Sequence, residues 1–216
     1  MRLRLPGLSR REFLKFLGAG SGLLFAGSLM EIHASPTSSV TRSAQGETQI
    51  DIDMSGQVGR FDTDTVMVAV TCPSCDAGSG KSIIIVIPGQ VKQAVRQKLQ
   101  EHFRLLRRPE LALYVAGLFI LIQRTTKSIP LDRGAQFLIE REFPGKEREI
   151  RGRLLNHFRT MDPVFAKERI VFGSMGRSSP AYKIAHAARR TRAAGEIIGD
   201  AEIISLEQLL AALGFS

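Results

Sequence analysis

Two apolar runs that lie close together constrain this chain more than any other feature of its sequence. Residues 65–71 (TVMVAVT) and 82–88 (SIIIVIP) are rich in Val and Ile, which favours buried β-strands. The segment between them, residues 72–81 (CPSCDAGSGK), is short and rich in Gly and Ser, as hairpin loops are. Because parallel strands need a much longer crossover, we predict that the two runs pair as antiparallel strands.

The loop between these strands contains fragments of two functional motifs. Residues 80–82 (GKS) match the end of a phosphate-binding loop, but Cys75 stands where its first glycine belongs and a strand follows where a helix is needed. This disfavours a nucleotide site. Cys72 and Cys75 form a Cys-x-x-Cys pair, which lacks the second pair of a zinc site and does not open a helix. An exported protein with a Cys72/Cys75 redox or metal pair stays open as an alternative.

The remaining periodicities alternate between helix and strand. Residues 49–53 (QIDID) alternate apolar and acidic residues, which predicts a strand with one buried face. Further strands are predicted at 135–140, at 169–172 and at either 196–198 or 202–204; helices are predicted at 91–106, 110–123, 146–161, 180–194 and from Ser205, with Ser179 and Ser205 as N-caps. The order β-β-β-α-α-β-α-β-α-β-α predicts an α/β fold with a mixed sheet, in which three antiparallel strands precede parallel strands added by crossovers.

The first residues have the layout of an export signal. Residues 9–15 (SRREFLK) match the twin-arginine pattern, and an apolar, glycine-rich stretch follows them. We therefore predict a signal segment at 1–34, a flexible spacer at 35–47 and a single domain at 48–216. The twin-arginine export machinery is the implied partner and the periplasm or exterior the implied location, or the cytoplasm if the start codon is misassigned.

One other apolar stretch could suggest a membrane segment. Residues 111–122 (LALYVAGLFILI) are continuously apolar but too short to cross a bilayer. We predict a buried core helix here and no stable membrane span in the mature chain.

Acidic residues occur at strand ends where they can converge. Asp51 and Asp53 are two residues apart on a predicted strand and so share a face; Glu140 closes a later strand and Glu142 follows it. If the two strands are neighbours, the four carboxylates form an oxygen site that suits Mg²⁺ or Mn²⁺. Acidic residues on the exposed face of a strand are also commonly only solvated, and that alternative stays open.

The basic residues are unevenly distributed. The formal net charge is +9, which makes an anionic partner such as nucleic acid plausible. Residues 176–192 carry cations with no interleaved acids, in contrast to residues 146–153, where arginines alternate with glutamates that can pair with them. The predicted nucleic-acid-binding residues are Arg177, Lys183, Arg189 and Arg190.

The order of elements resembles that of the ribonuclease H-like superfamily, which includes ribonuclease H and Holliday-junction resolvases. Residues 53–56 (DMSG) support the resemblance, because an acid followed by Ser-Gly recurs at the end of the first strand in part of that superfamily. Residues 140–147 (EREFPGKE) and 176–190 (GRSSPAYKIAHAARR) look like blocks of an uncharacterised prokaryotic family. The resemblance implies that Asp53 and Glu140 are catalytic metal ligands, with Asp51 and Glu142 as further candidates.

The last long helix departs from the superfamily pattern. Residues 181–194 contain no Asp or Glu, whereas the superfamily places a third acid or a His there, so His186 is the remaining catalytic candidate. The resemblance implies a metal-dependent nuclease, and the missing acid keeps a non-catalytic binding domain as an alternative.

Overall fold

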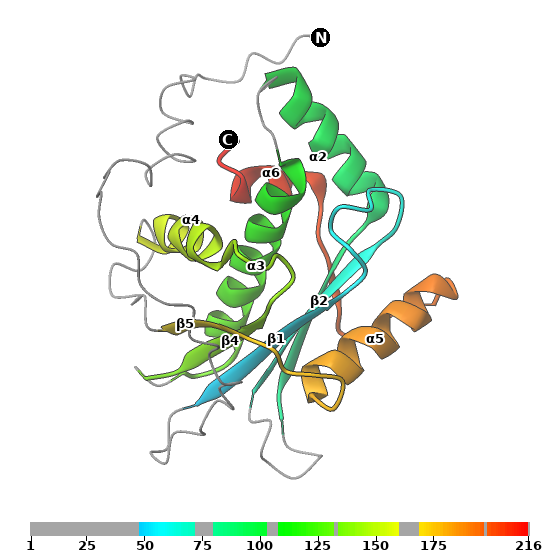
Figure 1. The fold of residues 1–216 in the computed structure, drawn as a ribbon. Helices are drawn as coiled ribbons and strands as arrows, with labels where there is room; N and C mark the ends of the chain where they lie inside the picture. Colours follow the sequence, from blue (N-terminus) through cyan, green and yellow to red (C-terminus); the bar gives the residue numbers. More distant parts are fainter. Residues whose placement is uncertain are drawn as a thin grey trace, which may run out of the picture.

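The computed structural model describes residues 48–71, 80–102, 108–131, 134–159, 169–196 and 198–215. The predicted signal segment at 1–34, the spacer at 35–47 and the Cys72/Cys75 pair lie outside these ranges. The described residues form one mixed sheet with helices on both of its faces (Figure 1).

The sheet has six strands in the order β5-β4-β1-β2-β3-β6. Their bounds are β1 Gln49–Ser55, β2 Thr65–Thr71, β3 Ser82–Ile87, β4 Gln136–Glu140, β5 Ile170–Gly173 and β6 Glu202–Ile203. β2 is antiparallel to both β1 and β3, and the pairs β1–β4, β4–β5 and β3–β6 are parallel. The predicted mixed sheet, with its antiparallel start and parallel additions, is confirmed.

The helices follow in the predicted order. Their bounds are α2 Gly89–His102, α3 Pro109–Ser128, α4 Glu147–Arg159, α5 Pro180–Ala193 and α6 Leu206–Ala212. α6 begins with the predicted capping box, in which the Ser205 hydroxyl accepts from Gln208 N at 3.2 Å and Gln208 Oε1 accepts from Ser205 N at 2.7 Å. Ser179 precedes α5 as predicted, but its side chain makes no cap hydrogen bond.

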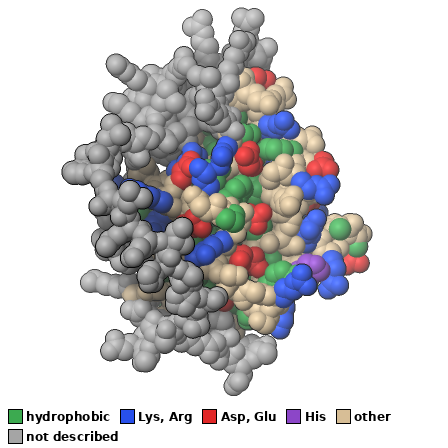
Figure 2. Space-filling model, in the orientation of Figure 1, with side chains coloured by type: hydrophobic (Ala, Val, Ile, Leu, Met, Phe, Trp, Pro, Cys, Tyr) green, Lys and Arg blue, Asp and Glu red, His purple; other side chains and the backbone are tan. Residues whose placement is uncertain are grey.

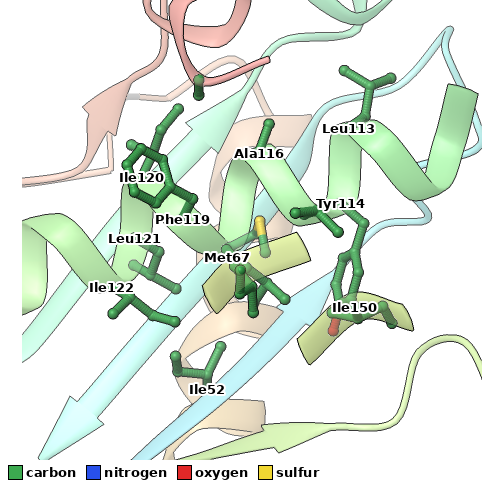
Figure 3. Close-up of a cluster of buried hydrophobic side chains, with 14 of the residues drawn as sticks. Ile52, Met67, Leu113, Tyr114, Ala116, Phe119, Ile120, Leu121, Ile122 and Ile150 are labelled. Carbon is green, nitrogen blue, oxygen red and sulfur yellow. The ribbon is translucent and has the colours of Figure 1, made fainter. Parts of the chain in front are cut away.

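The larger core lies between the sheet and α3. Ile52 of β1 and Met67 of β2 pack there with side chains of α3 and with Ile150 of α4 (Figure 3). α3 is buried along most of its length, so the prediction of a buried core helix is confirmed. Within the described ranges, no helix combines the length and the hydropathy that a membrane crossing requires.

The opposite face of the sheet is covered by α5. Its buried residues Ala181, Ala185 and Ala188 recur at helical spacing and pack with valines of β2 and β3, and the helix also lies against β1. Because alanine side chains are short, α5 lies close to the strands. The prediction that β1 has only one buried face is therefore wrong: Asp51 and Asp53 are only 5% and 6% exposed.

Gly117 of α3 lies against side chains of the sheet. A Cβ at this position would lie 2.7 Å from Met67 Sδ and 3.0 Å from Ile87 Cδ1. We expect Gly117→Ala to lower the free energy of unfolding by about 1–3 kcal/mol, because overpacking outweighs the better helix propensity of alanine. Urea denaturation measures the change.

Gly152 of α4 provides the matched control. A Cβ there would meet nothing within 4 Å, so Gly152→Ala is expected to stabilise the protein by up to about 1 kcal/mol. Equal effects at both positions would contradict the close packing of α3 on β2 and β3.

Candidate active site

Two adjacent parallel strands bring the predicted acidic residues together. β1 and β4 pair in a register that joins Asp51 to Leu138 and Ile52 to Ile139. Continued by one residue, this register sets Asp53 beside Glu140, where β4 ends. The condition on which the site prediction depended, that the two strands are neighbours, is confirmed.

A small hollow opens at this edge of the sheet. It has an empty volume of about 200 Å³, part of it open to solvent. Three carboxylate residues line it together with one phenol and apolar side chains; the lining residues are Ile52, Asp53, Met54, Met67, Tyr114, Leu118, Glu140 and Glu142. The hollow thus joins the edge of the main core to the predicted acidic residues.

Burial and mutual repulsion act on the carboxylates of this site. Burial raises the pKa of Asp53, and the charges of Glu140 and Asp51 raise it further, although Met54 N donates to Asp53 Oδ1 at 2.6 Å. Glu142 is exposed as a residue, but desolvation of its carboxyl group and then the charges of Asp53 and Glu140 raise its pKa. Among the described residues, no Lys, Arg or His forms a salt bridge with Asp53, Glu140 or Glu142.

Hydrogen bonds orient two of the carboxylates. Met175 N donates to Glu140 Oε2 at 2.6 Å, so the segment after β5 contacts the site. Gln49 Nε2 donates to Asp51 Oδ1 at 2.7 Å. Asp51 shares the face of Asp53 but lies one pair further from the strand end, outside the lining of the hollow.

Tyr114 is a site residue that the sequence did not indicate. It is 2% exposed, its hydroxyl donates to Glu140 O at 3.3 Å, and its ring centroid lies 5.1 Å from that of Phe143. Burial, followed by the charges of Glu142, Asp53 and Glu140, raises its pKa, so the phenol stays neutral. Tyr114 therefore contacts Glu140 before and Phe143 after Glu142, in the turn that leaves β4.

His186 lies apart from the carboxylates. It is exposed on α5, and its ring is stacked 5.8 Å from that of Tyr182. In the part of the chain that the structure describes, no hydrogen bond, ion pair or ring contact joins His186 to Asp53 or Glu140. The structure brings the predicted acids together but does not bring His186 to them.

The four predicted phosphate-binding cations are all exposed. Lys183, Arg189 and Arg190 lie on α5 and Arg177 lies in the turn before it. Figure 2 shows Lys and Arg side chains gathered around a histidine over α5. A fifth cation of this helix, Arg192, is paired with Asp64 at 2.8 Å. The basic face of α5, defined by Lys183, Arg189 and Arg190, begins beside the turn that contacts Glu140.

The carboxylates match the donor chemistry of a hard divalent cation. Within the described residues, no group of three or more His, Cys, Asp or Glu is spaced closely enough to hold an ion as it stands. Asp53 and Glu140, with Glu142 at the same hollow, nevertheless supply oxygen ligands whose repulsion a cation would relieve. Asp51 is a further candidate from the same face.

No family model, no curated protein and no solved structure matches this chain.

Proposed function

We propose that the chain is a metal-dependent nuclease, or a related nucleic-acid-processing enzyme, that hydrolyses phosphodiesters on a ribonuclease H-like sheet. One observation carries the proposal: Asp53, two residues before the end of β1, lies beside Glu140, the last residue of the adjacent parallel strand β4. The strand order, with an antiparallel β2 between β1 and β3, supports the resemblance to that superfamily.

Different residues of the site would bind the metal and the phosphates. Asp53 and Glu140 would hold Mg²⁺ or Mn²⁺, with Glu142 or Asp51 as an additional ligand. When bound, such an ion lowers the pKa of a coordinated water and offsets charge on the phosphodiester. Met175 N fixes the orientation of Glu140, and the exposed cations before and along α5 provide the charge that attracts a nucleic-acid backbone.

A non-catalytic binding domain is the second candidate. It is favoured by α5, which has no Asp or Glu, and by His186, for which no contact with the carboxylates is found within the described ranges. In this case the basic face would bind nucleic acid while the acidic site stays without catalytic function.

Incubation with labelled nucleic acids separates the two candidates. The protein is mixed with single- and double-stranded DNA, RNA and DNA–RNA hybrids, with and without Mn²⁺, and the products are resolved on denaturing gels. We expect cleavage of at least one substrate in Mn²⁺ and none in a chelator. Binding of these substrates without cleavage in Mn²⁺ would instead establish the non-catalytic candidate.

Export by the twin-arginine machinery is part of the proposal, and so is a periplasmic or extracellular location. Mass spectrometry of the protein purified from its native cells tests it. We expect a mature N-terminus near residue 35, whereas a chain that retains residues 1–34 would contradict export.

A further inference from the structure

The turn between β5 and α5 is attached directly to the candidate active site. Met175 N donates to Glu140 Oε2 at 2.6 Å, and Ser179 N donates to Gly176 O at 3.3 Å. Gly176 has φ of +68°, a left-handed conformation that favours glycine and lets the chain reverse here. Arg177 therefore lies in a closed turn, two residues from the backbone group that holds the carboxylate.

Arg177 has the reach and the freedom to act at this site. Two residues of chain span at most about 7 Å, so its Cα lies within that distance of the Cα of Met175. The side chain is exposed, and no salt bridge or hydrogen bond is found for its guanidinium among the described residues. In contrast, Arg192 Nε forms a salt bridge with Asp64 Oδ2 at 2.8 Å, and Arg153 Nη2 forms one with Glu149 Oε1 at 2.6 Å.

Arg189 occupies the other end of α5, beside the end of β1. Its Nε lies 3.3 Å from the point where a Cβ on Gly56 would stand, three residues beyond Asp53. The helix rises about 14 Å between Pro180 and Arg189, at about 1.5 Å per residue. A single phosphate cannot bridge that length, but a strand of several nucleotides can.

We propose that Arg177 contacts the phosphodiester that is cleaved at the carboxylates, while the basic face of α5 binds flanking phosphates of the same strand. The planar guanidinium can donate two parallel hydrogen bonds to one phosphate, which fixes its orientation as well as its position. This assignment rests on the proposed function. It makes the substrate a polynucleotide strand, DNA or RNA, and separates the residue that orients the reacting phosphate from those that only add affinity.

Two substrates of different length test the assignment. Single-turnover cleavage in Mn²⁺ is measured on labelled DNA and RNA oligonucleotides and on a small diester, bis(p-nitrophenyl) phosphate. Arg177→Gln is expected to slow both by about 100-fold or more, as the loss of one donor at a reacting centre does, and Arg177→Lys to recover part of the rate. Arg189→Gln is expected to slow cleavage of the oligonucleotides but not of the small diester. Whichever of the DNA and RNA oligonucleotides the wild-type protein cleaves faster identifies the natural substrate.

Arg148→Gln is the matched control. Arg148 is exposed on α4, which packs on α3 and so lies on the face of the sheet opposite α5. An Arg177→Gln protein that cleaves both substrates as fast as the Arg148→Gln protein would overturn the assignment.

Binding without metal keeps this test separate from the test of cleavage. Fluorescence anisotropy in a chelator gives the slope of log affinity against log salt, which is negative and becomes less steep by about 0.7–0.9 for each lost phosphate contact. We expect that loss in Arg177→Gln and not in Arg148→Gln. If the wild-type protein cleaves neither substrate, the proposed function fails, but an unchanged slope in Arg177→Gln would still refute the phosphate contact.

Discussion

Lys92→Met is expected to destabilise the protein by about 3 kcal/mol, because three oxygen acceptors lose their donor at about 1 kcal/mol each. Lys92 is 0% exposed, and its Nζ donates to Arg60 O at 2.7 Å, Thr65 Oγ1 at 2.8 Å and Gln57 O at 3.3 Å. It thereby joins the first turn of α2 to the segment that links β1 to β2. Thermal unfolding should show a fall in Tm of roughly 10 °C.

Lys98→Met on the same helix is the control. Lys98 is exposed, so its replacement should change the free energy of unfolding by no more than about 0.5 kcal/mol. If both variants unfold at the wild-type temperature, Lys92 does not support the segment between β1 and β2.

The titration of Lys92 should also make the free energy of unfolding depend on pH in the alkaline range. Burial, and to a smaller extent Arg189, lowers its pKa to about 8, although Asp64 and Asp62 oppose the shift. Between pH 8 and 10.5 the unfolded chain binds more protons at this residue than the folded protein does, so wild-type stability gains from rising pH. Lys92→Met lacks this gain, which urea titrations across that window would detect.

Asp53→Asn is expected to change stability in opposite directions with and without metal. Burial, and then the charges of Glu140 and Asp51, disfavour the Asp53 carboxylate, so the neutral amide should raise Tm in a chelator. In Mn²⁺ the wild-type protein should gain stability that the variant does not, and cleavage should fall by at least about 100-fold. Differential scanning calorimetry with and without Mn²⁺ measures both effects.

The pH dependence identifies the origin of the gain in the metal-free variant. Because the pKa of Asp53 is raised, the wild-type protein loses stability as pH rises above 3.8, where the unfolded carboxyl group ionises. The advantage of Asp53→Asn should therefore be present at neutral pH and vanish below pH 3.8. Asp62→Asn, an exposed loop acid, is the control, and an equal Mn²⁺ response in the Asp53 and Asp62 variants would exclude Asp53 as a ligand.

Much of the sheet followed from local patterns. β2 and β3 are adjacent in sequence and joined by a short loop, so their pairing needed no distant information. The last strand did not follow in this way: 196–198 and 202–204 carry similar short patterns. Only a distant contact decides between them, because β6 pairs with β3 and Glu202 binds Arg124 of α3 at 2.7 Å and 2.8 Å.

The same limit applied to the site. Asp53 and Glu140 were visible because Glu140 closes β4 and Asp53 was predicted to close β1, which in fact continues to Ser55, and the carboxyl-terminal parts of parallel neighbours meet at one edge. Tyr114 stood in an apolar run and gave no sign that its hydroxyl reaches Glu140 O. Lys92 resembled the other cations of an amphipathic helix, Arg96 and Lys98, and only the placement of the segment after β1 buries it.

The central position of β1 has a consequence for local motion. β1 is hydrogen-bonded to β2 on one side and to β4 on the other, and α3 and α5 cover its two faces. Its amides should therefore exchange with deuterium only when the whole domain opens. The strand that carries Asp53 belongs to the last cooperative unit to unfold, so inactivation by heat should coincide with global melting instead of preceding it.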